Sequence, residues 1–332
     1  MKAAVVGSGA WGTALAIRLC KNGHDVTMWT FEKDLIPEME STRRNPRLPS
    51  AVLPEGLKIS AEYSCVQGCK LVVMASPSFP ARAVGMAVAP YIDEDAVVVS
   101  VTKGLEAGTH KRMSQIVAEA TGREVVALTG PSHAEEVAID MPTGLLAACK
   151  DQAKAEFVQD AFMADALRVY TSSDAVGAEL GAALKNVIAL CAGITDGLGC
   201  GDNTKAMLMT RGLTETARLG VSLGASKDTF AGLAGVGDLI VTCTSMHSRN
   251  RRAGILIGQG MDAQSAMKEV GAVVEGYYAA KSAYELGQAQ GIDMPITEAA
   301  YKVLYENADV KETFMSLMNR QRKAESEDAG WL

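Results

Sequence analysis

The sequence has few of the features by which a metal site, a disulfide framework or a nucleic-acid surface is recognised. Its four histidines never fall in a ligand spacing such as HxxxH, so we expect no bound metal. The seven cysteines show no paired CxxC spacing and mostly lie in apolar runs, which predicts reduced thiols in a reducing compartment. A formal net charge of −7 leaves no basic footprint, so we expect no nucleic-acid partner.

Long hydrophobic runs are also missing. No apolar stretch reaches the length of a membrane span, and no cationic amphipathic segment is suited to a membrane surface. The apolar start of the chain is interrupted by Gly7, Gly9 and Gly12 and has no small-residue cleavage site, unlike a secretory signal peptide. We therefore expect a cytoplasmic protein with no membrane insertion.

The first half of the chain alternates short β-branched runs with amphipathic stretches. Continuous apolar strands separated by helices predict a parallel sheet that is covered on both faces. Such a Rossmann-type sheet would form an N-terminal α/β domain over residues 1–170. We expect strands at 2–6, 26–29, 71–75, 97–101, 125–128 and 143–148, and helices at 11–22 and 109–121.

The second half has a different composition, with long stretches rich in Ala, Leu, Met and Gly and almost no strand-like runs. This composition predicts an all-α substrate and catalytic domain over 171–322, followed by a polar tail over 323–332. At 332 residues, of which 48% are hydrophobic, the chain is long enough for two such domains. We expect helices at 175–194, 204–223, 251–259, 276–290 and 296–306.

A glycine motif near the N-terminus indicates a dinucleotide site. Gly7, Gly9 and Gly12 fit the pattern GxGxxG, follow an expected strand and open an expected helix. The first glycine permits a tight turn, the second lets the backbone approach a pyrophosphate, and the third lets the helix pack closely on the strand. A glycine-rich turn with no ligand is the alternative, but the strand–turn–helix context favours dinucleotide binding.

Lys185 is the only charge in the sixteen residues 180–195. Because such an apolar helix is buried almost all round, its ammonium group needs a partner or a cavity. Desolvation would lower the lysine pKa and suit it to proton transfer near neutral pH. A lysine that extends to solvent from the helix end is an equally good interpretation of the spacing alone.

Three other charged features stand out in the same way. Asp238 is the only charge in the segment 229–248, where it serves either a site or a helix cap. Arg249, Arg251 and Arg252 follow this segment and form either an anion clamp or a solvated basic face. Lys103 ends an expected parallel strand, a position that faces the cofactor crevice.

With these residues placed, the sequence resembles the bacterial NAD(P)-dependent glycerol-3-phosphate dehydrogenases from residue 1 to about residue 320. The resemblance is specific because eight motifs occur in the family's order. They are GSGAWGTALA at 7–16, VTKGLE at 101–106, TGPSHAEE at 129–136, ALKNVIALCAG at 183–193, AGVGDLIVTCTS at 234–245, SRNRR at 248–252, VVEGYYAAK at 273–281 and MPITEAAYKVLY at 294–305.

The resemblance implies reversible reduction of dihydroxyacetone phosphate to sn-glycerol 3-phosphate, which supplies phospholipid synthesis. It implies that Lys185 is the catalytic general acid and base. The substrate-binding residues that it implies, with Lys185 among them, are Lys103, Gly130, Ser132, Asn186, Asp238, Ser248, Arg249 and Asn250.

The cofactor implied by the resemblance is NAD or NADP, and we expect both to work. Phe31 departs from the family, because many relatives carry Arg or His beside the adenosine ribose. Glu32 and Lys33 follow it, and Glu32 stands about twenty residues beyond Gly12, where the ribose acid is expected. The implied cofactor contacts are Gly7, Gly9, Ala10, Trp11, Gly12, Phe31, Lys103, Ala134, Arg249, Val273 and Glu275.

Two other function classes remain open at this point. The chain could be a dinucleotide sensor without activity, although its lone charges argue against that reading. It could also be another two-domain hydroxyacid dehydrogenase, which should prefer a carboxylate to a phosphate ester. Beyond the substrate pair, a second copy of the chain in a homodimer is one partner to consider.

Overall fold

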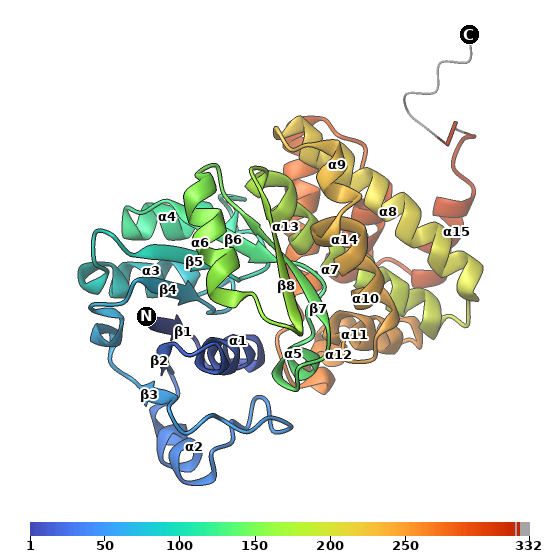
Figure 1. The fold of residues 1–332 in the computed structure, drawn as a ribbon. Helices are drawn as coiled ribbons and strands as arrows, with labels where there is room; N and C mark the ends of the chain where they lie inside the picture. The colour runs from blue at the N-terminus through green and yellow to red at the C-terminus, as the bar shows by residue number, and fades with distance from the viewer. Residues whose placement is uncertain (323, 326–332) are drawn as a thin grey trace.

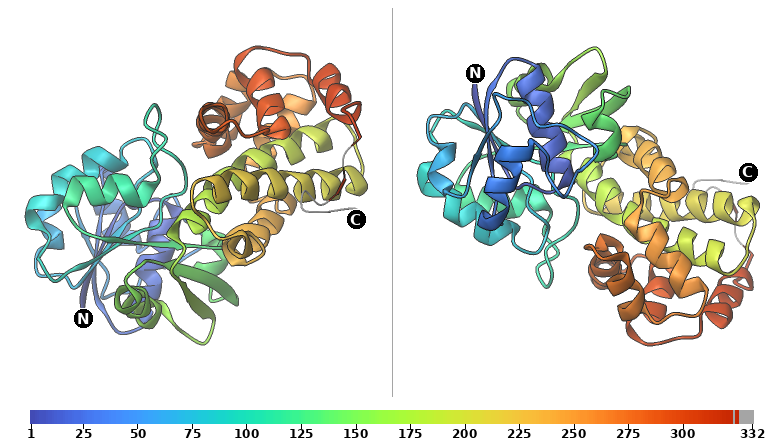
Figure 2. Two further views of the ribbon diagram at one scale, coloured as in Figure 1. Left: turned by 90° about the horizontal axis from the view of Figure 1, so that it is seen from above. Right: turned by 90° about the horizontal axis from the view of Figure 1, so that it is seen from below.

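The protein has two lobes, a sheet-containing lobe from the first half of the chain and a helical lobe from the second (Figures 1 and 2). The computed structural model describes residues 1–322, 324 and 325. The predicted polar tail over 323–332 lies outside the described residues apart from 324 and 325. An N-terminal Rossmann-type domain followed by a mostly helical region confirms the predicted fold class.

An eight-stranded sheet organises the first lobe, with the strand order β3-β2-β1-β4-β5-β6-β7-β8. All neighbouring strands are parallel except β6 and β7. The strands are β1 (Lys2–Val6), β2 (Asp25–Trp29), β3 (Lys58–Ser60), β4 (Leu71–Met74), β5 (Val97–Ser100), β6 (Val125–Thr129), β7 (Thr143–Ala148) and β8 (Leu167–Ser172).

All six expected strands are present, but the sheet also contains β3 and β8, which the sequence analysis missed. Both are edge strands. The three residues of β3 are exposed or half-buried, and β8 alternates buried with exposed or half-buried positions. Neither therefore has the continuous apolar run that predicts a central parallel strand. The expectation of a parallel sheet is wrong for β7, which runs antiparallel to β6.

The chain order of the strands predicts a ligand site at their carboxyl ends. β1 lies between β2 and β4, so the connections from β1 and from β4 leave toward opposite sides of the sheet. Ligands of open parallel sheets bind outside the carboxyl ends of the strands at such a switch point. The glycine motif follows β1 and Lys103 follows β5, so both lie at this edge.

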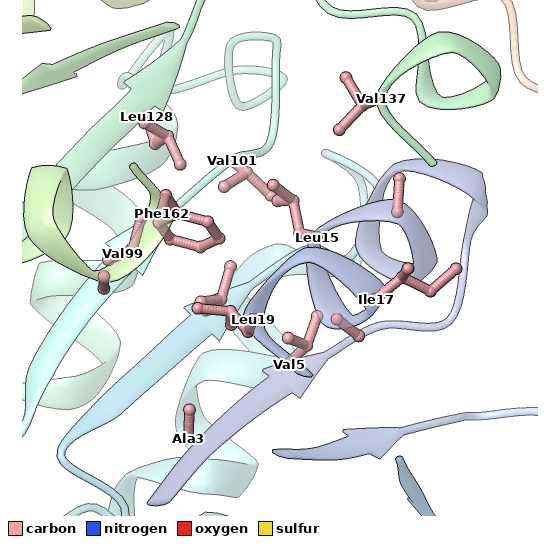
Figure 3. Packing of buried hydrophobic residues seen from close by; sticks show 14 of the residues in the cluster. Ala3, Val5, Leu15, Ile17, Leu19, Val99, Val101, Leu128, Val137 and Phe162 are labelled. Atoms are coloured by element: carbon pink, nitrogen blue, oxygen red, sulfur yellow. The ribbon is translucent and has the colours of Figure 1, made fainter. Parts of the chain in front are cut away.

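Helices cover both faces of the sheet, as the apolar strands require. One face packs against α1 (Ala10–Lys21), α2 (Ile36–Thr42), α5 (Ala134–Ala138) and α6 (Gln152–Phe162), and the other against α3 (Ala81–Val88) and α4 (Met113–Thr121). In the first core, Leu15 and Leu19 of α1 lie over Val5 and near Phe162 of α6 (Figure 3). The predicted helix at 109–121 begins only at Met113, because residues 101–112 form a loop.

The second lobe is built from nine described α-helices and the short π-helix η4 (Leu233–Gly237). All five expected helices are present with end residues shifted slightly, whereas α9, α10, α12 and α15 were missed because they are short. The helices are α7 (Ala175–Gly197), α8 (Asp202–Ser222), α9 (Lys227–Phe230), α10 (Asp238–Thr244), α11 (Arg249–Gly258), α12 (Ala263–Val270), α13 (Glu275–Gln290), α14 (Pro295–Tyr305) and α15 (Val310–Met318).

α7 is the central helix of this lobe and is buried from Gly177 to Thr195. Its small residues allow α11 to approach closely. A Cβ on Gly193 would lie 2.1 Å from the Arg251 carbonyl oxygen, and one on Gly254 would lie 2.0 Å from the Leu190 carbonyl oxygen. Contrary to the sequence analysis, which found no apolar stretch of that length, α7 is long and apolar enough to span a membrane, but 89% of its apolar window is buried inside the protein. It is therefore a core helix.

The change from strands to helices falls between the end of β8 at Ser172 and the start of α7 at Ala175. The predicted division at residue 170 lies inside β8, so the sheet extends slightly beyond it. Asp174 caps α7 by accepting a hydrogen bond from the Gly177 amide at 2.8 Å. The division into two domains remains a prediction.

Candidate active site

The glycine motif forms a tight turn between β1 and α1. Gly7 has a φ of +133°, and a Cβ there would lie 2.6 Å from the Ala75 carbonyl oxygen. A Cβ on Gly12 would lie 2.1 Å from the Gly7 carbonyl oxygen. Gly9 is exposed, with open space where a Cβ would point. The first and third glycines are thus required by packing, and the second leaves the backbone accessible to a ligand.

The start of α1 fits the phosphates of a dinucleotide. Gly9 occupies the N-cap position without a side-chain cap, so the first amides of the helix remain available to an anion. Ala10 and Trp11 form the first turn. The Trp11 indole nitrogen is buried and has no hydrogen-bond partner among the described residues. This buried donor beside the glycine turn is available to a bound dinucleotide.

Polar side chains that the sequence analysis missed stabilise this turn through hydrogen bonds. Ser8 donates a hydrogen bond to Thr30 at 2.7 Å between hydroxyl oxygens. The Asn45 amide donates to the Ser8 carbonyl oxygen at 2.8 Å and to the Thr13 hydroxyl at 2.7 Å. Asn45 lies far along the chain, so no local pattern indicated its contact with the motif.

The residues after β2 place both a negative and a positive charge where the adenosine ribose of the dinucleotide is expected to bind. Phe31 is 82% exposed and offers a ring surface there. Glu32 forms an ion pair with Arg47, whose second contact to that carboxylate, from Nε, is 3.3 Å long. Lys33 lies 3.6 Å from Glu62, measured from its Nζ to the Glu62 carboxylate. Arg47 is therefore a nearby cation that the sequence analysis did not identify.

Lys185 is buried on α7 and contacts two groups of α10. Its Nζ donates a hydrogen bond to one carboxylate oxygen of Asp238 and another, 2.7 Å long, to the Thr242 hydroxyl. Asp238 is only 1% exposed. The structure thus brings together the two lone charges that the sequence analysis singled out. Thr242 was missed, although its position four residues after Asp238 places it on the same helix face.

Lys103 completes this cluster from the sheet-containing lobe. Its Nζ donates to the other Asp238 oxygen at 2.8 Å and to the Gly130 carbonyl oxygen at 3.1 Å. Gly130 has a φ of +135°, and a Cβ there would lie 2.9 Å from the Gly144 carbonyl oxygen. Ser132 donates to the same Gly130 carbonyl at 2.9 Å. Two loops after parallel strands therefore meet at Lys103, which contacts α10 through the Asp238 carboxylate.

The cluster changes the acidity of Lys185. Burial, with a smaller contribution from the positive charge of Lys103, lowers the pKa of its ammonium group to about 7, and the Asp238 carboxylate opposes the shift. The pKa of His133, which lies near Lys185, is lowered by burial and by the lysine's charge. A lysine with this pKa exchanges a proton readily at neutral pH.

Two amides connect Lys185's helix to α11 and α13. The Asn250 side chain donates to the Asn186 side-chain oxygen at 2.9 Å and accepts a hydrogen bond from the Gly276 amide at 2.8 Å. A Cβ on Gly276 would lie 2.5 Å from the Asn186 carbonyl oxygen. Both asparagines are buried, so this chain of hydrogen bonds fixes the position of the α11 N-terminus.

Two of the three arginines after residue 248, Arg249 and Arg251, have different environments. Ser248 caps α11 by accepting a hydrogen bond from the Arg251 amide at 3.2 Å. The Arg251 guanidinium pairs with Asp196, 2.8 Å away, so it holds the fold together. Arg249 is exposed at the first position of α11 and forms no ion pair within the described part of the chain. The helix N-terminus and Arg249 are therefore available to an anion.

Glu275 and Ser78 connect the lobes on the other side of the cluster. The Ser78 hydroxyl donates to the Glu275 carboxylate at 2.9 Å. Burial raises the pKa of Glu275, while Ser78 and the nearby Arg249 lower it. Ser78 was missed, although the loop 77–80 follows β4 at the carboxyl edge. Ala134 is the first, buried residue of α5, and Val273 is 44% exposed just before α13.

A Rossmann-type glycine turn that fits a dinucleotide, together with a buried lysine in a helical lobe, defines the class of dinucleotide-dependent dehydrogenases. Family models match both parts of the chain: "NAD-dependent glycerol-3-phosphate dehydrogenase N-terminus" over residues 2–155 and the C-terminus of the same family over residues 174–315. The chain belongs to the NAD-dependent glycerol-3-phosphate dehydrogenase family.

Similar proteins match along almost the entire chain. Glycerol-3-phosphate dehydrogenase [NAD(P)+] of Thermoanaerobacter sp. (strain X514) is 50% identical over 326 residues, covering 98% of this chain and 99% of that protein. The enzyme of the same name from Clostridium acetobutylicum is 49% identical, covering 96% and 97%. The crystal structure of Coxiella burnetii glycerol-3-phosphate dehydrogenase is 36% identical with a TM-score of 0.92, covering 96% and 99%.

Proposed function

We propose that this enzyme interconverts dihydroxyacetone phosphate and sn-glycerol 3-phosphate, with NAD or NADP as the cofactor. The observation that carries the proposal is the buried Lys185, held by Asp238 and Thr242. This lysine faces the carboxyl edge of a sheet whose glycine turn fits a dinucleotide. Family membership supplies the identity of the substrate pair, which the geometry supports.

Lys185 is the catalytic acid and base in this proposal. When bound, the nicotinamide would supply the hydride chemistry at the substrate carbon. As a ketone is reduced, its oxygen gains negative charge and needs a proton, which the Lys185 ammonium group provides. In the reverse direction the neutral amine removes the proton from the alcohol. Because its pKa is about 7, both forms of the lysine are populated at neutral pH.

Asp238 and Lys103 set the conditions for that transfer. The Asp238 carboxylate fixes the Lys185 ammonium in place, and Lys103 neutralises the same carboxylate from the opposite lobe. A preorganised charge cluster of this kind needs no reorganisation during the reaction. Gly130 and Ser132, which adjoin Lys103, and Asn186 would complete the substrate site.

The phosphate of the substrate would bind at the N-terminus of α11. Ser248, Arg249 and Asn250 lie there, and the helix amides and the exposed guanidinium both favour an anion. Remote binding energy of this kind positions the carbon that reacts. The pyrophosphate of the cofactor would lie on Gly7, Gly9, Ala10, Trp11 and Gly12, with Phe31, Lys103, Ala134, Arg249, Val273 and Glu275 along the rest of the molecule.

The biological setting follows from the reaction. Glycerol 3-phosphate made by this enzyme would supply phospholipid synthesis in the cytoplasm. A homodimer is the assembly that we would test first. Neither role requires a nucleic acid or a membrane contact.

The direct test follows the nicotinamide absorbance of purified enzyme with dihydroxyacetone phosphate, first with NADH and then with NADPH. We expect turnover with both cofactors. Pyruvate and other 2-ketoacids, which carry a carboxylate in place of the phosphate ester, serve as competing substrates. Faster turnover of a ketoacid would replace the proposal with a hydroxyacid dehydrogenase. Dinucleotide binding without turnover of any substrate would indicate a sensor.

A further inference from the structure

The loop 101–112 carries Lys103 from the end of β5 toward α4 and rests on the helical lobe. Its Leu105 is buried in one apolar cluster with Leu180 and Leu184 of α7. His110 lies 3.6 Å from the Glu285 carboxylate of α13. The loop thus begins at the Asp238 cluster and crosses the surface of α7 before α4 starts.

Glu179 of α7 holds the far end of this loop. Its carboxylate accepts hydrogen bonds from the Ser114 amide at 2.7 Å and from the Ser114 hydroxyl at 2.5 Å. It also forms an ion pair with Arg112. Glu179 is only 6% exposed, so all three contacts are made inside the interface between the lobes.

These contacts supply an acceptor to the first amides of α4, whose own cap is partial: the Gln115 side-chain oxygen accepts a hydrogen bond from the Arg112 amide at 3.0 Å. The N-cap position of α4 is occupied by Arg112, whose side chain cannot accept a hydrogen bond from the first amides of the helix. Asp, Asn, Ser or Thr normally fills this position. The acceptor comes instead from α7, six residues before Lys185 on the same helix.

We propose that Glu179 is a positioning residue that sets the catalytic helix α7 against the cofactor lobe. This inference rests on the proposed function. The hydride site belongs to the cofactor lobe and the proton donor Lys185 to α7, so the reaction requires the two lobes in one relative position. Glu179, through Ser114 and Arg112, connects them at one end of loop 101–112, and Lys103 through Asp238 connects them at the other.

The test is Glu179→Gln, which keeps the size of the side chain but turns an amide donor toward Ser114 or Arg112. We expect kcat to fall roughly tenfold, because misplacing the reacting groups by about 1 Å can cost about 10²-fold. KM for dihydroxyacetone phosphate and the Kd for NADH should change by less than about twofold, since each ligand keeps its own contacts.

Glu215 offers a matched control within the helical lobe. Its buried carboxylate also caps a helix from another helix, accepting hydrogen bonds from the Ile296 amide at 3.0 Å, the Thr297 amide at 2.9 Å and the Thr297 hydroxyl at 2.6 Å. Its contacts stay within one lobe. Glu215→Gln should therefore alter the melting temperature but leave kcat within about twofold of wild type, as expected for a group with no role in the transition state.

Ser114→Ala provides a milder variant in case Glu179→Gln folds poorly. It removes one of the three contacts and should lower kcat in the same direction by a smaller factor. The proposal is overturned if both variants keep wild-type kcat, if Glu215→Gln lowers kcat equally, or if the Kd for NADH rises in step with the loss. Wild-type enzyme that fails to turn over dihydroxyacetone phosphate would instead refute the proposed function, so the two failures are distinguishable.

Discussion

Lys103 and Lys185 approach from different lobes and donate to the two oxygens of one carboxylate, that of Asp238. Lys103 contacts one oxygen at 2.8 Å from the loop after β5, and Lys185 contacts the other from α7. Two ammonium groups sharing one buried carboxylate leave a net positive charge where a substrate oxygen becomes negative. Burial is the main cause that lowers the pKa of Lys185 to about 7, and the charge of Lys103 adds to the shift that the adjoining Asp238 carboxylate opposes.

The first prediction concerns the proton donor. Lys185→Met keeps an unbranched apolar side chain of nearly the same length but removes the ammonium group that carries the proton. We expect turnover to fall by roughly 10²-fold or more, the usual scale of general acid–base catalysis, while dinucleotide affinity stays normal. Steady-state kinetics and a fluorescence titration with NADH measure the two quantities. Near-normal turnover would remove Lys185 from the mechanism.

The second prediction concerns pH. Ketone reduction needs the Lys185 ammonium group, so kcat/KM for dihydroxyacetone phosphate should decline as the pH rises above about 7. Alcohol oxidation needs the neutral amine, so its kcat/KM should decline as the pH falls below about 7. The charged groups facing this lysine are Asp238, Lys103 and, when protonated, His133. Initial rates in both directions from pH 5.5 to 9 are the measurement, and two profiles of the same slope would contradict the assignment.

The third prediction concerns the phosphate end of the substrate. Arg249→Ala should weaken apparent substrate binding by about 1.5–3 kcal/mol, typical of a charged hydrogen bond. Arg252→Ala, a neighbouring exposed arginine in the same helix, is the control and should have a small effect. Dihydroxyacetone without its phosphate should be a very poor substrate. Equal turnover of dihydroxyacetone and its phosphate would disprove the phosphate site.

The fourth prediction concerns the choice between NADH and NADPH. Phe31 provides no charge for a 2′-phosphate. The Glu32 carboxylate could accept a hydrogen bond from a free 2′-hydroxyl, but it is already paired with Arg47. We therefore expect both cofactors to work, with a preference for NADPH that is weak or reversed. Phe31→Arg should shift kcat/KM toward NADPH by roughly tenfold or more, since a charge-assisted contact contributes about 1.5–3 kcal/mol.

Arg47→Ala separates the two positions in that experiment. If Arg47 binds the 2′-phosphate, this variant should lose activity with NADPH and keep it with NADH. A strong wild-type preference for NADPH that Phe31→Arg leaves unchanged would show that position 31 does not contact the ribose. The measurement is kcat/KM for each cofactor in the three proteins.

Much of this protein was determined by local sequence. Gly7 and Gly12, between a strand and a helix, specified the tight turn, because only glycine fits where a Cβ would meet the Ala75 or Gly7 backbone. Lys185 and Asp238 stood out because an isolated charge in an apolar stretch must find a partner when it is buried. Backbone geometry at a turn and the cost of burying an isolated charge both depend on a few neighbouring residues, so a local pattern is enough to predict them.

Only the tertiary structure decided which charged side chains pair with one another and which strands lie side by side. Nothing near Arg251 in the sequence directed it to Asp196 while Arg249 stayed exposed, and nothing near Glu179 indicated that it caps α4. The antiparallel β7 and the edge strand β8 likewise depend on their neighbours in the sheet. Such contacts join residues that are far apart in the chain, and the packing of whole helices and strands selects among the many partners that each charge could have had.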